Sequence, residues 1–209
     1  MSQIFLASAS PRRAALLKLI GVPFHVVPSD FEEPPPTRWD NSGPAPYVMR
    51  LAREKAAHAV LPEQRDDKKY AGKKLVLAAD TIVWHEGEIL GKPRDENHAR
   101  EMLQRLSGAS HQVFTGVCLR EIENGRDEFH VAHQTTNVQF RPLNVAWISR
   151  YVATGEPLDK AGAYAAQGRG AAMIESIGGD FWNVVGLPLA TLGRLLETVG
   201  APLEEWWIK

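Results

Sequence analysis

The segment Leu75–Ala79 constrains the fold more than any other part of this sequence. Five consecutive apolar residues, followed by an acidic one, are typical of a β-strand that is buried on both faces. Gln3–Ala7 and Phe24–Val27 also have the length and composition of short strands. The sequence therefore predicts a sheet that includes at least one strand covered on both sides.

Asn124-Gly125 predicts a tight turn between two longer strands, because Asn-Gly suits the backbone of a two-residue hairpin loop. The strands are expected at Val113–Ile122 and Asp127–Phe140. Helical segments alternate with the strands, which indicates an α/β fold with a mixed sheet. We expect residues 1–209 to form a single domain. The predicted helices are Arg12–Ile20 after Ser10-Pro11, Tyr47–Val60, a helix capped by Asp95 and reaching Leu106, Leu143–Thr154 and Pro188–Val199.

Composition excludes several classes of protein. The 24 Lys and Arg residues against 25 Asp and Glu residues argue against a nucleic-acid binder, which would carry a basic face. Cys118 is the single cysteine, so a disulfide framework or a cysteine-based zinc site is excluded. Arg12 and Arg13 follow the short N-terminal apolar stretch instead of preceding it, unlike a signal peptide. We therefore expect a cytoplasmic protein with no nucleic-acid or membrane partner.

Two arginines occupy the first turn of a predicted helix. A helix N-terminus carries partial positive charge, so Arg12 and Arg13 each cost about 0.3–1 kcal/mol unless an anion compensates. The hydroxyls of Ser8 and Ser10, free backbone N–H groups and two guanidinium groups would together bind a polyphosphate. The alternative is a pair of solvated arginines at a helix end, and spacing alone favours neither.

Lys55 lies four residues after Leu51, on or beside the apolar stripe of its predicted helix. Its side chain either extends past the edge of the core, which is the commoner arrangement, or reaches into a cleft. Asp80 ends the apolar run of its strand, and ligands of open α/β sheets bind at the carboxyl ends of strands. A carboxylate there suits a divalent cation or the removal of a proton from water. The alternative, a cap, is disfavoured because no helical pattern follows.

Two glycine-containing segments place a polar side chain where a ligand can approach. Lys92 lies between Gly91 and Pro93, a stiff turn that suits a phosphate contact, although an exposed turn lysine is the alternative. Gln167 lies among small residues, and its amide offers both the donor and the acceptor needed to recognise a nucleotide base. The alternative for Gln167 is a crowded packing corner.

Other polar or apolar features have structural interpretations. Cys118 is expected to be a small buried side chain in a strand. His130 and His133 would face opposite sides of a strand, which disfavours joint metal binding. The apolar segment Trp206–Ile208 packs either on the protein's own core or on a second subunit.

Taken in order, these segments resemble the Maf family of house-cleaning nucleotide pyrophosphatases. Each segment alone is a weak signal, but the ordered set from residue 8 to residue 188 is highly specific. The matching segments are Ser8–Arg13, Leu51–Ala56, Ala79–Thr81, Leu90–Pro93, Ser107-Gly108 with His111, Thr115–Val117, Lys160–Gly168 and Asn183–Pro188.

The resemblance implies a Maf/inosine triphosphatase-like fold, in which a twisted mixed sheet is flanked by helices and the site lies in a central cleft between two lobes. Family members cleave a nucleoside triphosphate between the α and β phosphates with a divalent cation. The products are the nucleoside monophosphate and pyrophosphate. The resemblance is also compatible with a homodimer.

Roles for individual residues follow from the same resemblance. Ser8, Arg12 and Arg13 would bind the triphosphate of the substrate. Lys55 and Lys92 would offset the charge that develops on the phosphoryl oxygens.

The remaining roles concern water, metal and base. Asp80 would position or deprotonate the attacking water, and Glu33 would assist it in binding Mg²⁺ or Mn²⁺. Gln167 is typical of members that act on dTTP and UTP, a subgroup also linked to modified pyrimidine nucleotides such as 5-methyl-UTP and pseudo-UTP. Ala109 stands where many members have a basic residue, so any role of that side chain is absent here.

Two other functions compete with this one. A purine or 7-methyl-GTP pyrophosphatase is disfavoured by Gln167, because members with that preference typically carry Glu in a different local context. A nucleotide-binding regulator of septum formation with little turnover is disfavoured because a degenerate binder could lose Asp80, which is present together with both lysines.

Overall fold

The computed structural model describes residues 2–33, 42–62 and 72–207. The strands are β1 (Gln3–Ala7), β2 (Phe24–Val27), β3 (Lys74–His85), β4 (Glu88–Leu90), β5 (Ser110–Glu123), β6 (Arg126–Phe140) and β7 (Ile174–Gly178). The α-helices are α1 (Pro11–Leu19), α2 (Pro44–Ala57), α3 (Glu96–Leu106), α4 (Val145–Val152), α5 (Phe181–Val185) and α6 (Leu189–Thr198). The short 3-10 helices are η2 (Glu156–Asp159), η3 (Ala161–Ala163), η4 (Arg169–Met173) and η5 (Leu203–Trp206).

The strands form one mixed sheet, as predicted. Its order is β2-β1-β3-β5-β6-β7, and β4 pairs with β3. Strands β2, β1 and β3 are parallel to one another, whereas β3, β5, β6 and β7 pair antiparallel. The hairpin predicted at Asn124-Gly125 is confirmed, since β5 and β6 pair up to the turn, with Glu123 opposite Arg126.

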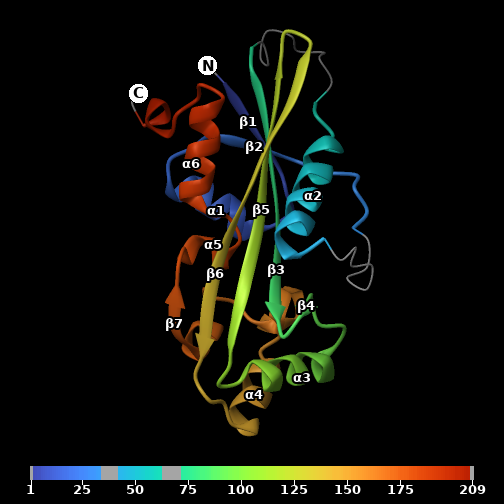
Figure 1. Cartoon of the computed structure of the whole chain (residues 1–209), viewed down its shortest axis with the longest axis vertical. Coiled ribbons are helices and arrows are strands. Elements are labelled where there is room, and N and C mark those ends of the chain that lie inside the picture. The colour runs from blue at the N-terminus through green and yellow to red at the C-terminus, as the bar shows by residue number, and fades with distance from the viewer. Residues whose placement is uncertain (1, 34–41, 63–71, 208–209) are drawn as a thin grey trace.

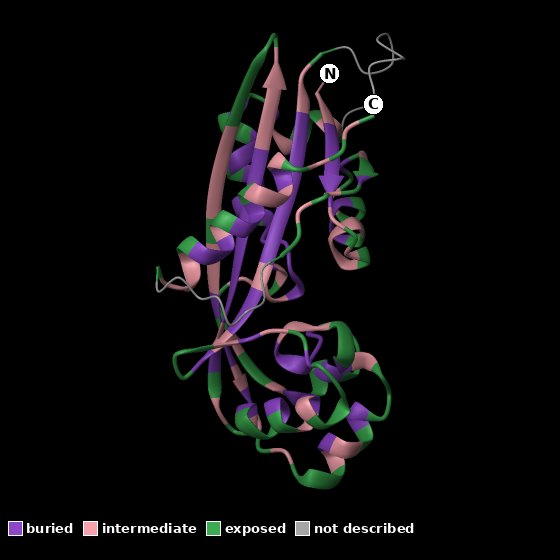
Figure 2. Ribbon diagram, turned by 90° about the vertical axis from the view of Figure 1, so that its right-hand side faces the viewer, coloured by how far each residue is buried: buried purple, intermediate pink, exposed green. Residues whose placement is uncertain are grey.

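Three long strands, β3, β5 and β6, join two lobes of the molecule (Figure 1). The lobe at the top of that view holds β1 and β2 together with α1, α2 and α6, and the lobe at the bottom holds β4, β7, α3 and α4. Figure 2 shows the same two lobes from the side, joined by the strands. The expectation that residues 1–209 form a single domain stays a prediction.

Alternate residues of β3 face opposite layers of helix, which confirms that Leu75–Ala79 is buried on both faces. The odd-numbered residues of this segment pack with α1 and α6, and the even-numbered ones pack with α2. Because the side-chain period of a strand is two residues, the same alternation directs Asp80 toward α2 and Thr81 toward α1. The strand therefore directs these two neighbouring polar residues toward two different helices.

Gly116 allows α2 to lie directly against the sheet beside Asp80. In the ladder between β3 and β5, Gly116 is the partner of Asp80. A Cβ atom at Gly116 would lie 2.2 Å from the carbonyl oxygen of Val48 in α2. Since any side chain would collide there, the missing Cβ permits the close approach that brings Lys55 to β3.

Several boundaries differ from the predicted ones. Helix α2 begins at Pro44, before the predicted start at Tyr47, because proline is tolerated in the first turn of a helix. Ser10 occupies the N-cap position of α1, but its hydroxyl forms no capping hydrogen bond. Residues 34–41, which include three consecutive prolines, and residues 63–71 lie outside the described residues.

Trp206 and Trp207 contact their own chain, and Ile208 lies outside the described residues. Trp206 packs against the cluster that contains α1 and α6, and the indole N–H of Trp207 donates to the carbonyl of Ile20 at 2.7 Å. Cys118 is fully buried, as predicted, and burial raises the pKa of its thiol to about 12. Among the described residues, no helix has both the length and the apolar character needed to cross a bilayer.

Candidate active site

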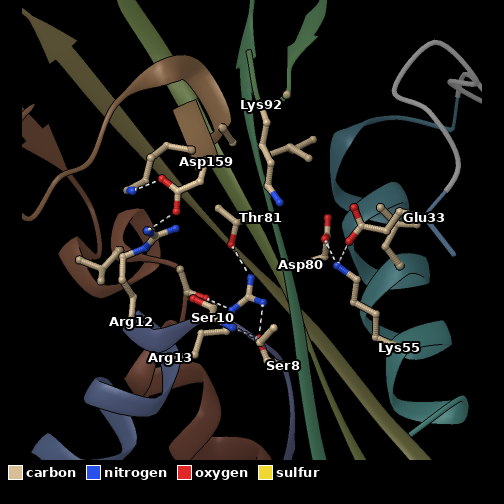
Figure 3. Close-up of a pocket in the computed structure, with 18 of the residues that line it drawn as sticks. Ser8, Ser10, Arg12, Arg13, Glu33, Lys55, Asp80, Thr81, Lys92 and Asp159 are labelled. Carbon is tan, nitrogen blue, oxygen red and sulfur yellow. Dashed lines mark hydrogen bonds and ion pairs between the residues drawn. The ribbon is translucent and has the colours of Figure 1, made fainter. Parts of the chain in front are cut away.

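A cavity of about 1010 Å³ is bordered by both lobes, and Figure 3 shows part of its wall. The turn between β1 and α1, helix α2 and strand β3 line it from one lobe, and the segments after β4 and η2 line it from the other. Its wall contains every site residue predicted from the sequence, namely Ser8, Arg12, Arg13, Glu33, Lys55, Asp80, Lys92 and Gln167.

The cavity lies where one edge of β3 has no neighbouring strand among the described residues. The pairing of β1 with β3 ends at Leu77, and the pairing of β4 with β3 begins at Val83. Asp80 lies between these two points. The prediction that Asp80 ends its own strand is wrong, because β3 continues to His85; the strand that ends beside the cavity is β1, at Ala7.

Lys55 reaches into the cavity and joins two carboxylates (Figure 3). Its Nζ lies 2.6 Å from Oδ1 of Asp80 and also contacts a carboxylate oxygen of Glu33. The Lys55 side chain is 16% exposed and that of Asp80 is 9% exposed, so water screens this pair weakly. Of the two arrangements expected for the Lys55 side chain, the commoner one, in which it extends past the edge of the core, is therefore wrong. The other arrangement, in which the side chain reaches into a cleft, is correct.

Glu33 comes from the loop after β2 and is half exposed. Burial alone would raise the pKa of its carboxyl, but the Lys55 ammonium, with smaller contributions from Lys92 and Arg13, lowers it below the ordinary value of 4.5. Glu33 is thus ionised at neutral pH and can contribute a negative charge beside Asp80.

The Arg13 guanidinium is held by three partners from different parts of the chain. It donates to the carbonyl of Gly186 at 2.8 Å, to the Ser8 hydroxyl at 3.1 Å and to the Thr81 hydroxyl at 3.2 Å. Burial lowers the pKa of Arg13, and the charge of Asp80 opposes that shift. The group is therefore fixed in direction before any ligand binds.

Arg12 connects the two lobes. It lies 3.9 Å from the carboxylate of Asp159 in η2, and the same carboxylate contacts Lys160. Asp159 and Thr81 were not among the predicted site residues, although Thr81 belongs to a segment singled out next to Asp80. Nothing in the spacing of the sequence indicates that Asp159 meets Arg12, because that contact depends on how the lobes are placed.

Lys92 and Gln167 line the cavity from the lower lobe. Lys92 is exposed and extends toward Asp80 and Glu33 in Figure 3. Its turn is anchored by a hydrogen bond from the Gly162 N–H to the carbonyl of Gly91. Gln167 is also exposed, so its amide is accessible to a ligand in the cavity.

The donor set suits a divalent cation at one place in the cavity. Asp80 and Glu33 converge on a common positive group, the Lys55 ammonium, and Mg²⁺ is commonly bound by one or two carboxylates together with substrate phosphates. Outside the cavity, Glu121, Glu128 and His130 also lie close together. There, however, Glu121 is already bonded to Lys73 at 2.6 Å and to His130 at 3.1 Å.

Comparison with known proteins identifies the family of this chain. The family model described as Maf-like protein matches residues 3–199. A protein of Symbiobacterium thermophilum named dTTP/UTP pyrophosphatase is 48% identical over 203 residues, which cover 97% of each chain. Proteins with the same name from Caldicellulosiruptor bescii and Methanosarcina barkeri are each 44% identical, over at least 97% of both chains. The range matched by the family model includes every residue that lines the cavity, and this chain belongs to the Maf family.

Proposed function

We propose that this protein is a nucleoside triphosphate pyrophosphatase that hydrolyses dTTP and UTP to the nucleoside monophosphate and pyrophosphate. The observation that carries the proposal is the meeting of Asp80 with Lys55 in a cavity whose opposite walls hold Arg13 and Lys92. A carboxylate placed among cations can act on a water molecule while the cations hold a polyanionic substrate. The names of the relatives at 44–48% identity support the same reaction and substrates.

The triphosphate binds at the start of α1. Backbone N–H groups at a helix N-terminus favour anions, and the fixed guanidinium of Arg13 adds hydrogen-bond donors there. Ser8 holds Arg13 and also accepts from the Ser10 N–H at 3.2 Å, which shapes this turn. Arg12 contributes a second guanidinium from the same helix turn.

Asp80 acts as the general base in the hydrolysis. Its carboxylate accepts a proton from water as the water oxygen attacks the α-phosphorus, and the bond between that phosphorus and the α–β bridging oxygen breaks. The electron pair of the broken bond leaves with pyrophosphate. Lys55 and Lys92 offset the negative charge that develops on the phosphoryl oxygens.

Glu33 and Asp80 are the residues that would hold Mg²⁺ or Mn²⁺. The ion would supply positive charge beside the phosphates and favour ionisation of water. In the same proposal, Gln167 recognises the pyrimidine base through its amide donor and acceptor. The protein works on a free nucleotide in the cytoplasm, with neither nucleic acid nor a membrane as partner, and a homodimer remains a prediction.

Pyrophosphate release from dTTP, UTP, CTP, ATP, GTP and 7-methyl-GTP tests the proposal, each with Mg²⁺, Mn²⁺ or EDTA. We expect release that needs the metal and is fastest with dTTP and UTP. Fastest release with 7-methyl-GTP would contradict the pyrimidine specificity and support the alternative substrate. Folded protein that binds nucleotides without releasing pyrophosphate would contradict the enzyme itself and support the regulatory alternative.

A further inference from the structure

Glu156 binds the backbone of the segment that carries Gln167. It is the first residue of η2, and its side chain is 17% exposed. Its Oε1 accepts a hydrogen bond from the N–H of Gly170 at 2.9 Å, and its Oε2 accepts one from the N–H of Arg169 at 3.1 Å. One carboxylate thus holds two neighbouring backbone N–H groups, which fixes the turn that begins immediately after Gln167.

Tyr151 links Glu156 to the backbone on the other side of Gln167. Its hydroxyl donates to Oε1 of Glu156 at 3.0 Å and accepts from the N–H of Ala165 at 3.3 Å. Tyr151 is 3% exposed, so these bonds face little competition from water. The pair therefore holds the backbone both before and after Gln167.

Two glycines let the backbone after Gln167 approach the side chains of Glu156 and Tyr151 closely. Gly168 has φ +108°, a conformation that residues with side chains rarely adopt, and a Cβ there would lie 3.0 Å from Oε2 of Glu156. A Cβ at Gly170 would lie 2.8 Å from the Tyr151 hydroxyl and 2.5 Å from the carbonyl oxygen of Ala165. The backbone is thus packed directly against the carboxylate and the hydroxyl.

The carboxylate is ionised at neutral pH. Burial alone would raise the pKa of Glu156, but hydrogen bonds from Gly170, Arg169 and Tyr151 lower it below the ordinary value of 4.5. An ionised carboxylate accepts hydrogen bonds and donates none, so it matches the three donors that surround it.

Gln167 itself has no side-chain support within the described part of the chain. Its side chain is exposed on the cavity wall, and no described residue forms a hydrogen bond or an ion pair with its amide. The position of the amide therefore depends on the backbone on which it stands, and that backbone is held by Glu156 and Tyr151.

We propose that Glu156 is a positioning residue for base specificity, which places the Gln167 amide where it recognises a pyrimidine. The inference rests on the proposed function, because it needs Gln167 to contact the base. Glu156 does not touch the substrate; it acts through two backbone hydrogen bonds.

The test is the ratio of kcat/KM for UTP to kcat/KM for CTP in the wild type and in Glu156→Gln. The glutamine has the same shape, but its NH₂ group would face one of the backbone N–H donors, so the turn must shift. A displacement of about 1 Å can cost about 100-fold in rate, and we expect the UTP/CTP ratio to fall by about tenfold or more. Glu96→Gln, which removes an exposed ion pair with Arg100, is the matched control and should leave the ratio unchanged.

A double-variant cycle separates positioning from a general structural role. In a Gln167→Ala background, Glu156→Gln should have no further effect on the ratio, because the group that it positions is gone. Equal effects of Glu156→Gln in both backgrounds would overturn the inference. Should Glu156→Gln fail to fold, Tyr151→Phe provides the same comparison, since it removes the hydroxyl that links Glu156 to Ala165.

Amide hydrogen exchange provides a readout that does not depend on turnover. Exchange at Arg169 and Gly170 should be faster in Glu156→Gln than in the wild type, while exchange in β5 stays the same. Unchanged exchange, or an unchanged UTP/CTP ratio in a variant that turns over, contradicts the inference alone. A wild type without turnover on any nucleotide contradicts the proposed function, and the inference falls with it.

Discussion

The Lys55 ammonium and the Asp80 carboxylate lie 2.6 Å apart, although the residues are 25 positions apart in the sequence. The contact exists because two features coincide. The alternation along β3 directs Asp80 toward α2, and Gly116 on the neighbouring strand lets α2 approach closely enough for Lys55 to reach it. A buried carboxylate with an adjacent cation is thereby placed on the wall of the cavity.

Asp80→Asn should keep the fold and lose nearly all turnover. The amide cannot accept a proton from water, and loss of a general base typically reduces rate by about 10²–10⁴-fold. Steady-state pyrophosphate release with UTP, together with thermal unfolding, measures both effects. Asp127→Asn, which removes an exposed partner of Arg120, is the control. Wild-type rates in Asp80→Asn would remove this residue from the mechanism.

Lys55→Met should destabilise the protein, and adding Asp80→Asn should restore most of the loss. Removing the ammonium leaves Asp80, whose side chain is 9% exposed, without its nearest cation. Breaking a fully buried pair costs about 3–5 kcal/mol, whereas replacing both charges is close to neutral. We expect a cost at or below the low end of that range here, because the pair lies on a cavity wall and is partly exposed. Urea unfolding of both single variants and the double variant provides the test. If the losses of unfolding free energy in the two single variants were additive in the double variant, the two residues would not stabilise each other. Lys92→Met is the control for the loss of an exposed lysine in the same cavity.

Arg13→Lys should raise the KM for UTP by tenfold or more. The guanidinium donates in three directions, to Gly186, Ser8 and Thr81, and an ammonium cannot reproduce that planar geometry. The same charge is therefore present without the same orientation. The measurement is steady-state kinetics at a saturating concentration of metal. The control variant is Arg105→Lys, because the Arg105 guanidinium lies 2.8 Å from the exposed carboxylate of Glu88. If KM and kcat were both unchanged, the phosphate-binding role of Arg13 would be wrong.

Gly116→Ala should be strongly destabilising. The added Cβ would lie 2.2 Å from the Val48 carbonyl oxygen, so α2 must move away from β5. Overpacking of this kind costs about 1–3 kcal/mol or more. Gly178→Ala is a matched control, because its Cβ would meet only the Asn137 Cβ at 3.9 Å. Equal midpoints of urea unfolding for the two variants would contradict the close approach of helix and strand.

His111 should make the stability of the fold depend on pH. Burial, with a smaller contribution from His85, lowers the pKa of His111 to about 3, against an ordinary value of 6.5. Between these two values the unfolded chain binds the proton and the folded chain does not, so stability falls as pH decreases. From pH 7.5 to pH 5 the loss due to His111 is about 2 kcal/mol.

Comparison of His111→Gln with the wild type isolates this contribution. The variant should lose less stability than the wild type over the same pH interval, as measured by urea unfolding. His133→Gln, at an exposed histidine, should keep the wild-type slope. Identical slopes for the wild type and His111→Gln would contradict the prediction.

The local sequence predicted several elements of this fold, because interactions between residues that are close in the sequence favour them. The apolar run of β3 and the Asn-Gly turn of the β5–β6 hairpin both appear in the structure as expected. The end of β3 was predicted wrongly, since Thr81 and the residues after it continue the strand. A strand's length depends on which neighbours pair with it, and β5 pairs with β3 as far as Trp84.

The sequence by itself indicated polar side chains that line the cavity, because the misplaced arginines, the acidic end of an apolar run and the glycine-rich segments are visible without coordinates. It did not indicate Thr81 or Asp159, which line the same cavity. Tertiary structure decided which of them contact one another. Only the packing of α2 on Gly116 turned Lys55 toward Asp80, and only the placement of the lobes brought Asp159 to Arg12. The tertiary structure also decided that Glu156 holds the backbone next to Gln167. Hydrogen bonds between a side chain and the backbone of a separate segment leave no periodic signal in a sequence, because they depend on distance in space.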